Sequence, residues 1–228
     1  MLVKWGSIIV KGSGKLGGHV FSSGPSGASV HTLAKARNPQ TVSQSAVRSR
    51  FTKFAQGWRD LTESQRESWY DAESSFSRTN RFGDVVFLSG KNLYESLNTN
   101  RAIMGLGVID LAPMPGEIPK NIVTRVEFNS SFTNLAIVGN FENSIDYVIV
   151  ATKGLSQGVR NFKNEIRIIG IGRSSTNGQS IIVGSDQMAS YRAEFGEPVA
   201  GTKIFVGTYS INTSGQRSPV SMLQADFV

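Results

Sequence analysis

Residues 41–76 read TVSQSAVRSRFTKFAQGWRDLTESQRESWYDAESSF, and this stretch decides the fold of the first half of the chain. Apolar side chains recur near its start at alternating spacings of four and three residues: Val47, Phe51, Phe54, Trp58 and Leu61. That period predicts an amphipathic helix with its apolar residues on one side. The basic residues of the same stretch fall mostly off the apolar stripe.

Two pairs of polar residues mark where helices begin. Thr41 and Gln44 have the spacing of a capping box, in which side chains satisfy free backbone donors of the first turn. Thr62 and Gln65 repeat that spacing. Because Thr62 directly follows Leu61, the second helix should begin almost where the first one ends. The apolar face of this second helix is expected to consist of Trp69, Ala72 and Phe76.

A third helix is expected after Ser89, which is a favourable N-cap residue. One face of it would carry Leu93, Leu97 and Met104. Residues 41–105 are therefore predicted to be a helical region.

The segment before these helices, residues 1–40, is basic and rich in glycine and serine. Short strands are expected at residues 2–10 and 19–21, with flexible, turn-rich pieces at residues 12–18 and 22–29. The segment is predicted to be either a small hairpin or an extended arm. A stretch this poor in large apolar residues cannot easily build its own core, so we expect a partner to order it.

The pattern changes again after residue 105. Residues 106–120 hold three prolines and two glycines, directly after Gly105, and are predicted to be a linker. From residue 121 onward, apolar residues alternate in short runs that are separated by Gly and Asn turn signals. Residues 121–228 are therefore predicted to be an antiparallel β-sandwich of the immunoglobulin or fibronectin III type. The fold class expected for the whole chain is α+β and multidomain.

The sequence offers little for catalysis. Cysteine is absent, which excludes disulfides, thiol catalysis and cysteine-zinc sites. A phosphate-loop interpretation of the GSGK at residues 12–15 fails, because Ile9 and Leu16 stand where the motif requires Gly and Ser or Thr. His19 and His31, the two histidines, have no carboxylate in their region to orient them. We therefore expect neither an enzyme nor a metal or cofactor site.

Two further features have structural explanations. Glu63 and Glu67 lie one helical turn apart and are expected on a solvated face, within reach of Arg59 and Arg66 for ion pairs. The chain has no apolar run long enough for a membrane span, so no membrane partner is expected.

Charge is distributed unevenly. Residues 1–105 hold 14 Lys and Arg against 7 Asp and Glu, whereas the rest of the chain is balanced at 10 against 10. The first acidic residue is Asp60. This asymmetry indicates contact with something anionic, either nucleic acid or an acidic protein surface. The residues expected to make assembly contacts are Lys4, Trp5, Lys11, Lys15, Lys35, Arg37, Arg48, Arg50 and Lys53.

One string of residues in the first half of the chain is distinctive: RNPQT at residues 37–41, then Gln44, Arg48 and Phe51, and then Trp58-Arg59, Leu61-Thr62, Gln65-Arg66 and Trp69. Residues 14–21 and the SGKNLY at residues 89–94 fit the same pattern, together with Leu97-Asn98. In these residues the chain resembles small structural proteins of bacteriophages and prophages. Residues 201–211, with Ser214-Gly215-Gln216 and Ser218, are similar to the last strands of fibronectin-III-like or immunoglobulin-like modules on phage particles.

The resemblance implies a structural component of the virion, made in the bacterial cytoplasm. Its partners would be the major capsid protein, the portal or neck and tail proteins, and also packaged DNA. The basic arm would dock on the lattice, the β domain would be presented outward, and the assembled form would be multimeric. Two alternatives stay open from the residues: a DNA-binding or packaging accessory protein, and a host-surface glycan-binding module.

Overall fold

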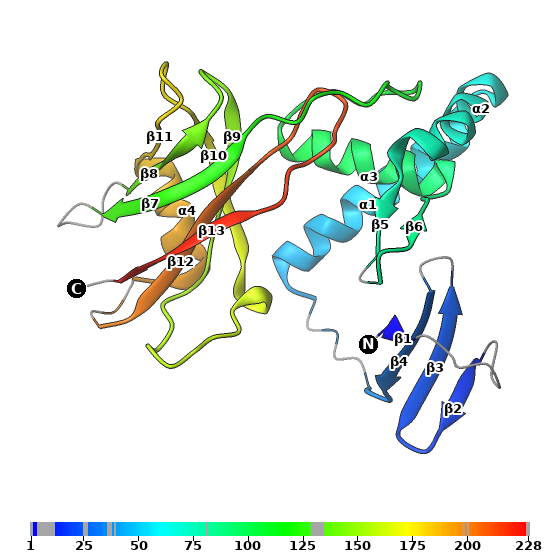
Figure 1. Ribbon diagram of the computed structural model, residues 1–228, viewed down its shortest axis with the longest axis horizontal. Helices are drawn as coiled ribbons and strands as arrows, with labels where there is room; N and C mark the ends of the chain where they lie inside the picture. The colour runs from blue at the N-terminus through cyan, green and yellow to red at the C-terminus, as the bar shows by residue number, and fades with distance from the viewer. Residues whose placement is uncertain are drawn as a thin grey trace. The chain divides into compact units, whose positions relative to one another are not determined.

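The structure is a computed structural model that describes residues 2–3, 12–24, 27–35, 38, 40–80, 82–128, 135–197, 199 and 201–226. Over these residues the chain mixes α-helices with several antiparallel sheets (Figure 1). It divides into two compact units. Unit 1 contains Met1–Ser96 with Ile109–Met114, and unit 2 contains Leu97–Val108 with Pro115–Val228.

Unit 1 begins with a small antiparallel sheet. Its strands are β1 (Leu2–Val3), β2 (Gly14–Leu16), β3 (His19–Gly24) and β4 (Gly27–Thr32), in the order β1-β4-β3-β2. Of the two alternatives expected for residues 1–40, the described residues show the hairpin. Residues 22–29 had been expected to be flexible, but the described ones form the facing ends of β3 and β4, where the hydroxyls of Ser22 and Ser29 lie 2.7 Å apart. Cross-strand serine pairing therefore outweighs the turn tendency of this composition.

The helical hairpin follows as α1 (Val42–Asp60) and α2 (Glu63–Asp71). Both predicted N-caps are confirmed: the Thr41 hydroxyl accepts from the Gln44 amide, and Thr62 forms a full capping box with Gln65. Arg66 fastens the two helices together. Its guanidinium donates to the carbonyl of Trp58 at 3.3 Å and to that of Arg59 at 2.7 Å, which satisfies carbonyls at the end of α1.

Three buried aromatic rings form the centre of unit 1. The Tyr94 ring lies 5.6 Å from that of Trp58 and 5.3 Å from that of Trp69, measured between centroids. The Trp69 indole also donates to the carbonyl of Asp110 at 2.8 Å, so this buried polar group is satisfied. Burial, and then the charges of Asp110, Asp60 and Glu95, raise the pKa of Tyr94 above its ordinary value. The predicted core role of the two tryptophans is confirmed.

The remaining elements of unit 1 lead into the third helix. They are the 3₁₀ helix η1 (Ala72–Phe76), the short strand pair β5 (Arg78–Thr79) and β6 (Val85–Val86), and the start of α3 (Gly90–Ile103). The Glu73 carboxylate accepts from the Gly90 amide at 2.6 Å, where negative charge favours a helix N-terminus. A Cβ at Gly90 would lie 3.0 Å from the backbone of Trp69 and Tyr70, so this close approach requires glycine.

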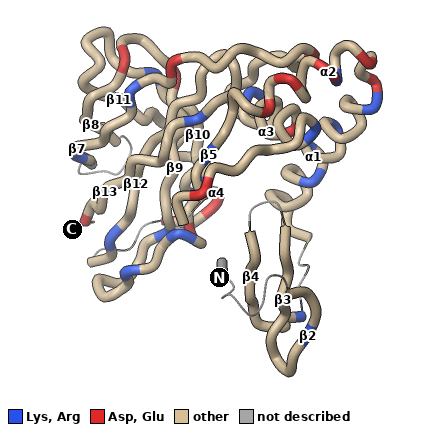
Figure 2. Tube along the Cα trace, turned by 45° about the vertical axis from the view of Figure 1, so that its right-hand side comes forward, with Lys and Arg blue, Asp and Glu red and all other residues tan. Residues whose placement is uncertain are grey.

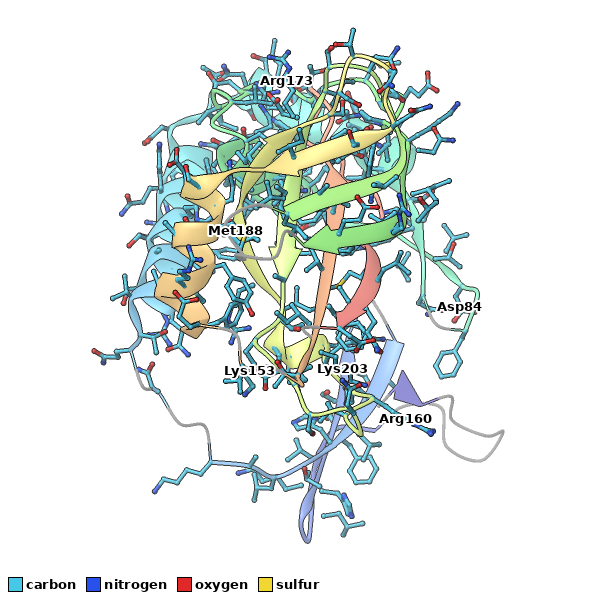
Figure 3. The ribbon with its side chains drawn as sticks, turned by 90° about the vertical axis from the view of Figure 1, so that its left-hand side faces the viewer. Asp84, Lys153, Arg160, Arg173, Met188 and Lys203 are labelled. Carbon is cyan, nitrogen blue, oxygen red and sulfur yellow. The ribbon has the colours of Figure 1, made fainter. Side chains whose placement is uncertain are left out.

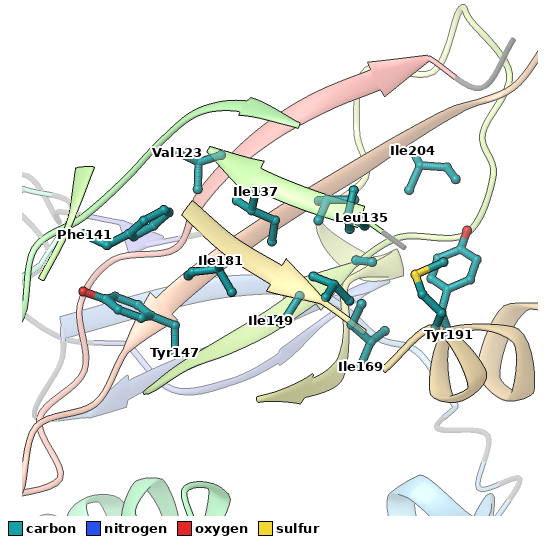
Figure 4. Close-up of a cluster of buried hydrophobic side chains, with 14 residues drawn as sticks. Val123, Leu135, Ile137, Phe141, Tyr147, Ile149, Ile169, Ile181, Tyr191 and Ile204 are labelled. Carbon is teal, nitrogen blue, oxygen red and sulfur yellow. The ribbon is translucent and has the colours of Figure 1, made fainter. Parts of the chain in front are cut away.

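Unit 2 consists of two antiparallel sheets around one core. The first sheet has the order β11-β8-β7, from β7 (Asn121–Phe128), β8 (Leu135–Phe141) and β11 (Ser180–Val183). The second has the order β10-β9-β12-β13, from β9 (Asp146–Ala151), β10 (Arg167–Arg173), β12 (Lys203–Ser210) and β13 (Ser221–Asp226). Both sheets contribute side chains to the same hydrophobic cluster (Figure 4). The short helix η2 (Lys163–Glu165) precedes β10.

After its first residue, Asp146, strand β9 is apolar because it is covered on both faces. Tyr147, Ile149 and Ala151 belong to the main core. Val148 and Val150 belong to a second cluster on the other face, with Tyr209 and Ile211, against which Ile103 and Met104 pack.

Helix α4 (Ser185–Phe195) was not expected from the sequence. It lies between β11 and β12 in the chain, and its Met188 and Tyr191 are buried in the main core (Figures 3 and 4). The signal was present in the sequence. Met188, Tyr191 and Phe195 have helical spacing, and Gly196 directly after them adopts a φ of +81°, as the residue after a helix often does.

One edge of the second sheet is irregular. The pairing of β10 with β9 shifts register between Ile168 and Gly170, which marks a β-bulge. Gly170 has a φ of +159°, and a Cβ there would lie 2.6 Å from the Gln187 side chain. The amide of that same Gln187, on α4, donates to the Ile171 carbonyl at 2.9 Å. Helix α4 thus covers part of the β10 edge.

The middle and the end of the predicted linker, residues 106–120, are bound to folded structure. The Ala112 amide donates to the Ser68 hydroxyl at 3.2 Å within unit 1. The Ser210 hydroxyl donates to the Pro119 carbonyl at 2.8 Å within unit 2. The prolines and glycines prevent regular structure here, but backbone groups of the segment still find partners.

Candidate assembly surface

The nine expected contact residues have different outcomes. Lys4, Trp5, Lys11 and Arg37 lie outside the described residues. Lys15 is exposed on β2, and Lys35 is exposed after β4. Arg48, Arg50 and Lys53 are brought together on α1, where Arg50 is half-buried and the other two are exposed. The structure therefore places three of the nine on the first turns of one regular helix.

The first three turns of α1 are almost uncovered. Of residues 42–53 only Arg50 is even half-buried, whereas burial begins abruptly at Phe54, which is 2% exposed. Val42, Val47 and Phe51 are 88%, 45% and 51% exposed. The apolar stripe expected along the whole helix is thus confirmed only in its second half. Helical stretches of about 12 residues are marginal without tertiary packing, so this part of α1 lacks its usual source of stability.

Cations flank the exposed apolar residues on both sides. At about 100° of rotation per residue, Arg48 falls on one side of the stripe through Val47 and Phe51, while Arg50 and Lys53 fall on the other. At the same rotation Val42 and Lys53 lie about 120–140° from Val47, so the exposed residues of these turns wrap around much of the helix. We call Val42, Val47, Arg48, Arg50, Phe51 and Lys53 the α1 docking face. It carries three cations and no carboxylate.

The cations of the α1 docking face are not neutralised within the described part of the chain. The ion pairs among the described residues are Lys91–Glu95 on α3 and several pairs within unit 2, and none of them includes a cation of the α1 docking face. Arg48 does donate to the Asn38 side-chain oxygen at 2.7 Å, which holds it near the start of the helix. Figure 2 shows basic residues along α1 and acidic residues along α2.

Helix α2 presents the opposite charge. Glu63, Glu67, Tyr70 and Asp71 are all exposed and follow one another at positions i, i+4, i+7 and i+8, which lie on one helical face. We call these four residues the α2 acidic face. Tyr70 lies within it and is 52% exposed.

Sequence reasoning treated Glu63 and Glu67 as a solvated face within ion-pair reach of Arg59 and Arg66. Across the described residues these ion pairs do not form, because Arg66 binds the carbonyls at the end of α1 instead. The sequence did contain a signal for the α2 acidic face, because Tyr70 and Asp71 continue the helical spacing of Glu63 and Glu67.

The described aromatic residues of unit 2 that bear on the glycan-binding alternative do not form an exposed group. Tyr191 and Tyr209 are buried and Phe195 is half-buried. Lys203, which sequence reasoning did not single out, is buried at the end of unit 2 where Figure 3 also labels Lys153 and Arg160. Its ammonium donates to the Gln157 carbonyl at 2.7 Å, so this lysine fastens the loop before β10.

The described residues contain no group of three or more His, Asp or Glu that could hold a metal ion. Among the helices of the described chain, none combines the length and the apolar character that crossing a membrane requires. Comparison of the chain with protein-family models and with curated protein sequences gives no match.

Proposed function

We propose that this chain is a structural component of a bacteriophage particle. It docks on the capsid or neck lattice through its basic N-terminal segment and α1, and it presents the β unit as a further module. The observation that carries this proposal is the α1 docking face, a regular helical surface that is exposed, basic and partly apolar. Such a surface is left uncovered by the residues that the structure describes, and a virion component must have partners.

The strand pairing of unit 2 supports the finer proposal of an Ig-like or fibronectin III-like sandwich. By their order in the chain, β7, β8 and β11 correspond to strands A, B and E, and β9, β12 and β13 correspond to C, F and G. The remaining strand, β10, pairs with the C equivalent rather than with the E equivalent. That pairing favours the fibronectin III variant, with α4 inserted between the E and F equivalents.

The test is the protein composition of particles of the phage that encodes this chain. Particles are purified through a density gradient, washed at high salt and analysed by quantitative mass spectrometry. We expect the chain at a fixed ratio to the major capsid protein in every gradient fraction that contains intact particles. Its absence from those fractions would contradict the proposal.

A DNA-binding or packaging accessory protein is the second candidate, and the cations of α1 that have no carboxylate partner favour it. Neutralising phosphates would make the affinity for duplex DNA fall steeply with salt. The apolar members of the α1 docking face, Val42, Val47 and Phe51, do not suit contact with phosphates. A protein partner accounts for both the charge and the apolar residues of this face, so it is preferred.

A further inference from the structure

We propose that copies of this chain bind one another head to tail, with the α1 docking face of one copy packing on the α2 acidic face of the next. Because it names what the α1 docking face contacts in the particle, this contact rests on the proposed function. It also adds to that function, since it makes the chain a partner of itself.

The two faces are complementary in charge. The α1 docking face carries three cations and no carboxylate, and the α2 acidic face carries three carboxylates and no cation. The one cation inside α2, Arg66, is held by the carbonyls of Trp58 and Arg59. Opposite potentials on two surfaces raise the rate of encounter and fix the register of the complex.

Each face also offers side chains that suit a protein partner. Val47 and Phe51 stand between Arg48 on one side and Arg50 on the other, and Tyr70 stands among the three carboxylates. Aromatic residues and arginine are enriched in protein–protein interfaces because they bury large areas at low entropic cost. Packing Phe51 and Tyr70 together would remove two half-exposed rings from water.

The two faces do not satisfy each other within one copy. Trp58, Trp69 and Tyr94 pack between the helices, and both faces are exposed in the folded chain. Residues 42–53 span about 18 Å and α2 about 14 Å at 1.5 Å per residue, so their lengths match in an intermolecular contact. The second copy would also supply the tertiary packing that the first turns of α1 lack.

Because the two faces differ, the contact is heterologous. A head-to-tail contact produces a closed ring when its rotation divides a full turn, and a helical filament when it does not. Both products repeat the same contact from copy to copy, as expected for a component that covers a particle lattice or forms a neck ring.

The test is a charge swap followed by sedimentation velocity over a range of protein concentrations. The first variant carries Arg48→Glu, Arg50→Glu and Lys53→Glu. The second carries Glu63→Gln, Glu67→Lys and Asp71→Lys. We expect the unchanged chain to associate at low salt and to dissociate as salt is raised, because exposed charges are screened. Each variant alone should stay monomeric, and an equimolar mixture should associate again.

The matched control reverses three exposed cations of unit 2 instead, with Lys120→Glu, Arg160→Glu and Lys163→Glu. It changes the net charge as much as the first variant does and should associate like the unchanged chain. Circular dichroism of every variant checks that folding is preserved. Loss of association in the control, or failure of the mixture to associate, would overturn the head-to-tail contact.

A second readout does not depend on charge. Because the chain has no cysteine, Phe51→Cys and Tyr70→Cys can be introduced in separate preparations. Oxidation of their mixture should give a disulfide-linked heterodimer in high yield, whereas Lys163→Cys mixed with Tyr70→Cys should not. Equal yields in the two mixtures would contradict the contact.

Failure here and failure of the proposed function are distinguishable. A chain that is present in purified particles but monomeric at every concentration would sink the head-to-tail contact alone. A chain that self-associates but is absent from particles would sink the virion role alone. Assembly that appears only when duplex DNA is added would favour the nucleic-acid candidate and overturn the direct contact.

Discussion

The core of unit 2 closes on itself, whereas the first three turns of α1 remain uncovered. In unit 2, side chains from two sheets and from α4 meet in one cluster, and every apolar layer finds a second layer within the same chain. In α1, Val47 and Phe51 continue the stripe of Phe54 and Trp58, but none of the described residues of unit 1 buries them. The spacing of apolar residues in a sequence therefore shows which side chains share a face of a helix. It does not show whether the surface that covers them belongs to the same chain.

The sharpest test of this contrast uses two phenylalanines of one helix. Phe54→Ala removes a ring that is 2% exposed and should cost about 3–5 kcal/mol of unfolding free energy. Phe51→Ala removes a half-exposed ring and should change the free energy by less than about 0.5 kcal/mol. Chemical denaturation followed by tryptophan fluorescence reports on unit 1, because all three tryptophans fall in its sequence. Equal losses for the two variants would show that the first turns of α1 are packed.

Two isoleucines of β11 make the same comparison inside unit 2. Ile181 is fully buried between the sheets, and its neighbour Ile182 is 69% exposed on the opposite face of the strand. Ile181→Ala should destabilise unit 2 by about 2–5 kcal/mol because it leaves a cavity in the core. Ile182→Ala should stay within about 0.5 kcal/mol of the unchanged chain. Urea denaturation followed by far-UV circular dichroism measures both, and a costly Ile182→Ala would reveal a hidden contact on the outer face.

A pH titration probes the closed core through Tyr191. Burial raises the pKa of Tyr191 to about 12, above the ordinary value of 10.0. The folded state therefore holds this proton more tightly, and the resulting stability is present below about pH 10 and lost as the pH rises toward 12. Tyr191→Phe should flatten the decline in stability over that range.

The same variant has a smaller effect at neutral pH. It removes the hydrogen bond from the Tyr191 hydroxyl to the Thr152 carbonyl and should cost about 1 kcal/mol. Burial also raises the pKa values of Tyr94 and Tyr147, so part of the alkaline decline should remain. An unchanged alkaline profile would indicate that Tyr191 is accessible to water.

The smallest expected effect separates folding from assembly. Val47→Ala places a better helix former at an exposed position and should stabilise free α1 by a few tenths of a kcal/mol, on the order of 0.5 at most. The same change should weaken self-association, because it removes apolar area from the α1 docking face. Denaturation should therefore show a small gain in folding stability, while sedimentation velocity should show weaker self-association. A change of the same sign in both would mean that Val47 serves the fold alone.

Much of the architecture was accessible from the sequence. Helix starts at Thr41 and Thr62 followed from capping chemistry, which is local and needs only two side chains at the right spacing. The strands of unit 2 followed from alternation and turn residues. Helix α4 was missed because its three core residues are interrupted by polar ones and surrounded by strand signals, so tertiary packing had to reveal it.

The candidate assembly surface could be predicted from the sequence only in part. Clustering of Arg48, Arg50 and Lys53 could be expected, since all three lie on a predicted helix. The exposure of Val47 and Phe51 could not, because the stripe that they share with Phe54 and Trp58 predicts burial along its whole length. The hydrogen-bond partners of Arg66 could not be predicted either, because its charge suits both a carboxylate and the C-terminus of a helix. In the structure it binds the carbonyls at the end of α1.

The bulge in β10 and the Gln187 side chain against it have a consequence for solubility. An open sheet edge is a template on which another chain can add a strand, and crowding many copies together makes such growth more dangerous. The register shift at Ile168 and Gly170 distorts that template, and the Gln187 amide already occupies the Ile171 carbonyl. This edge of the sheet is thereby a poor template for strand addition by another chain.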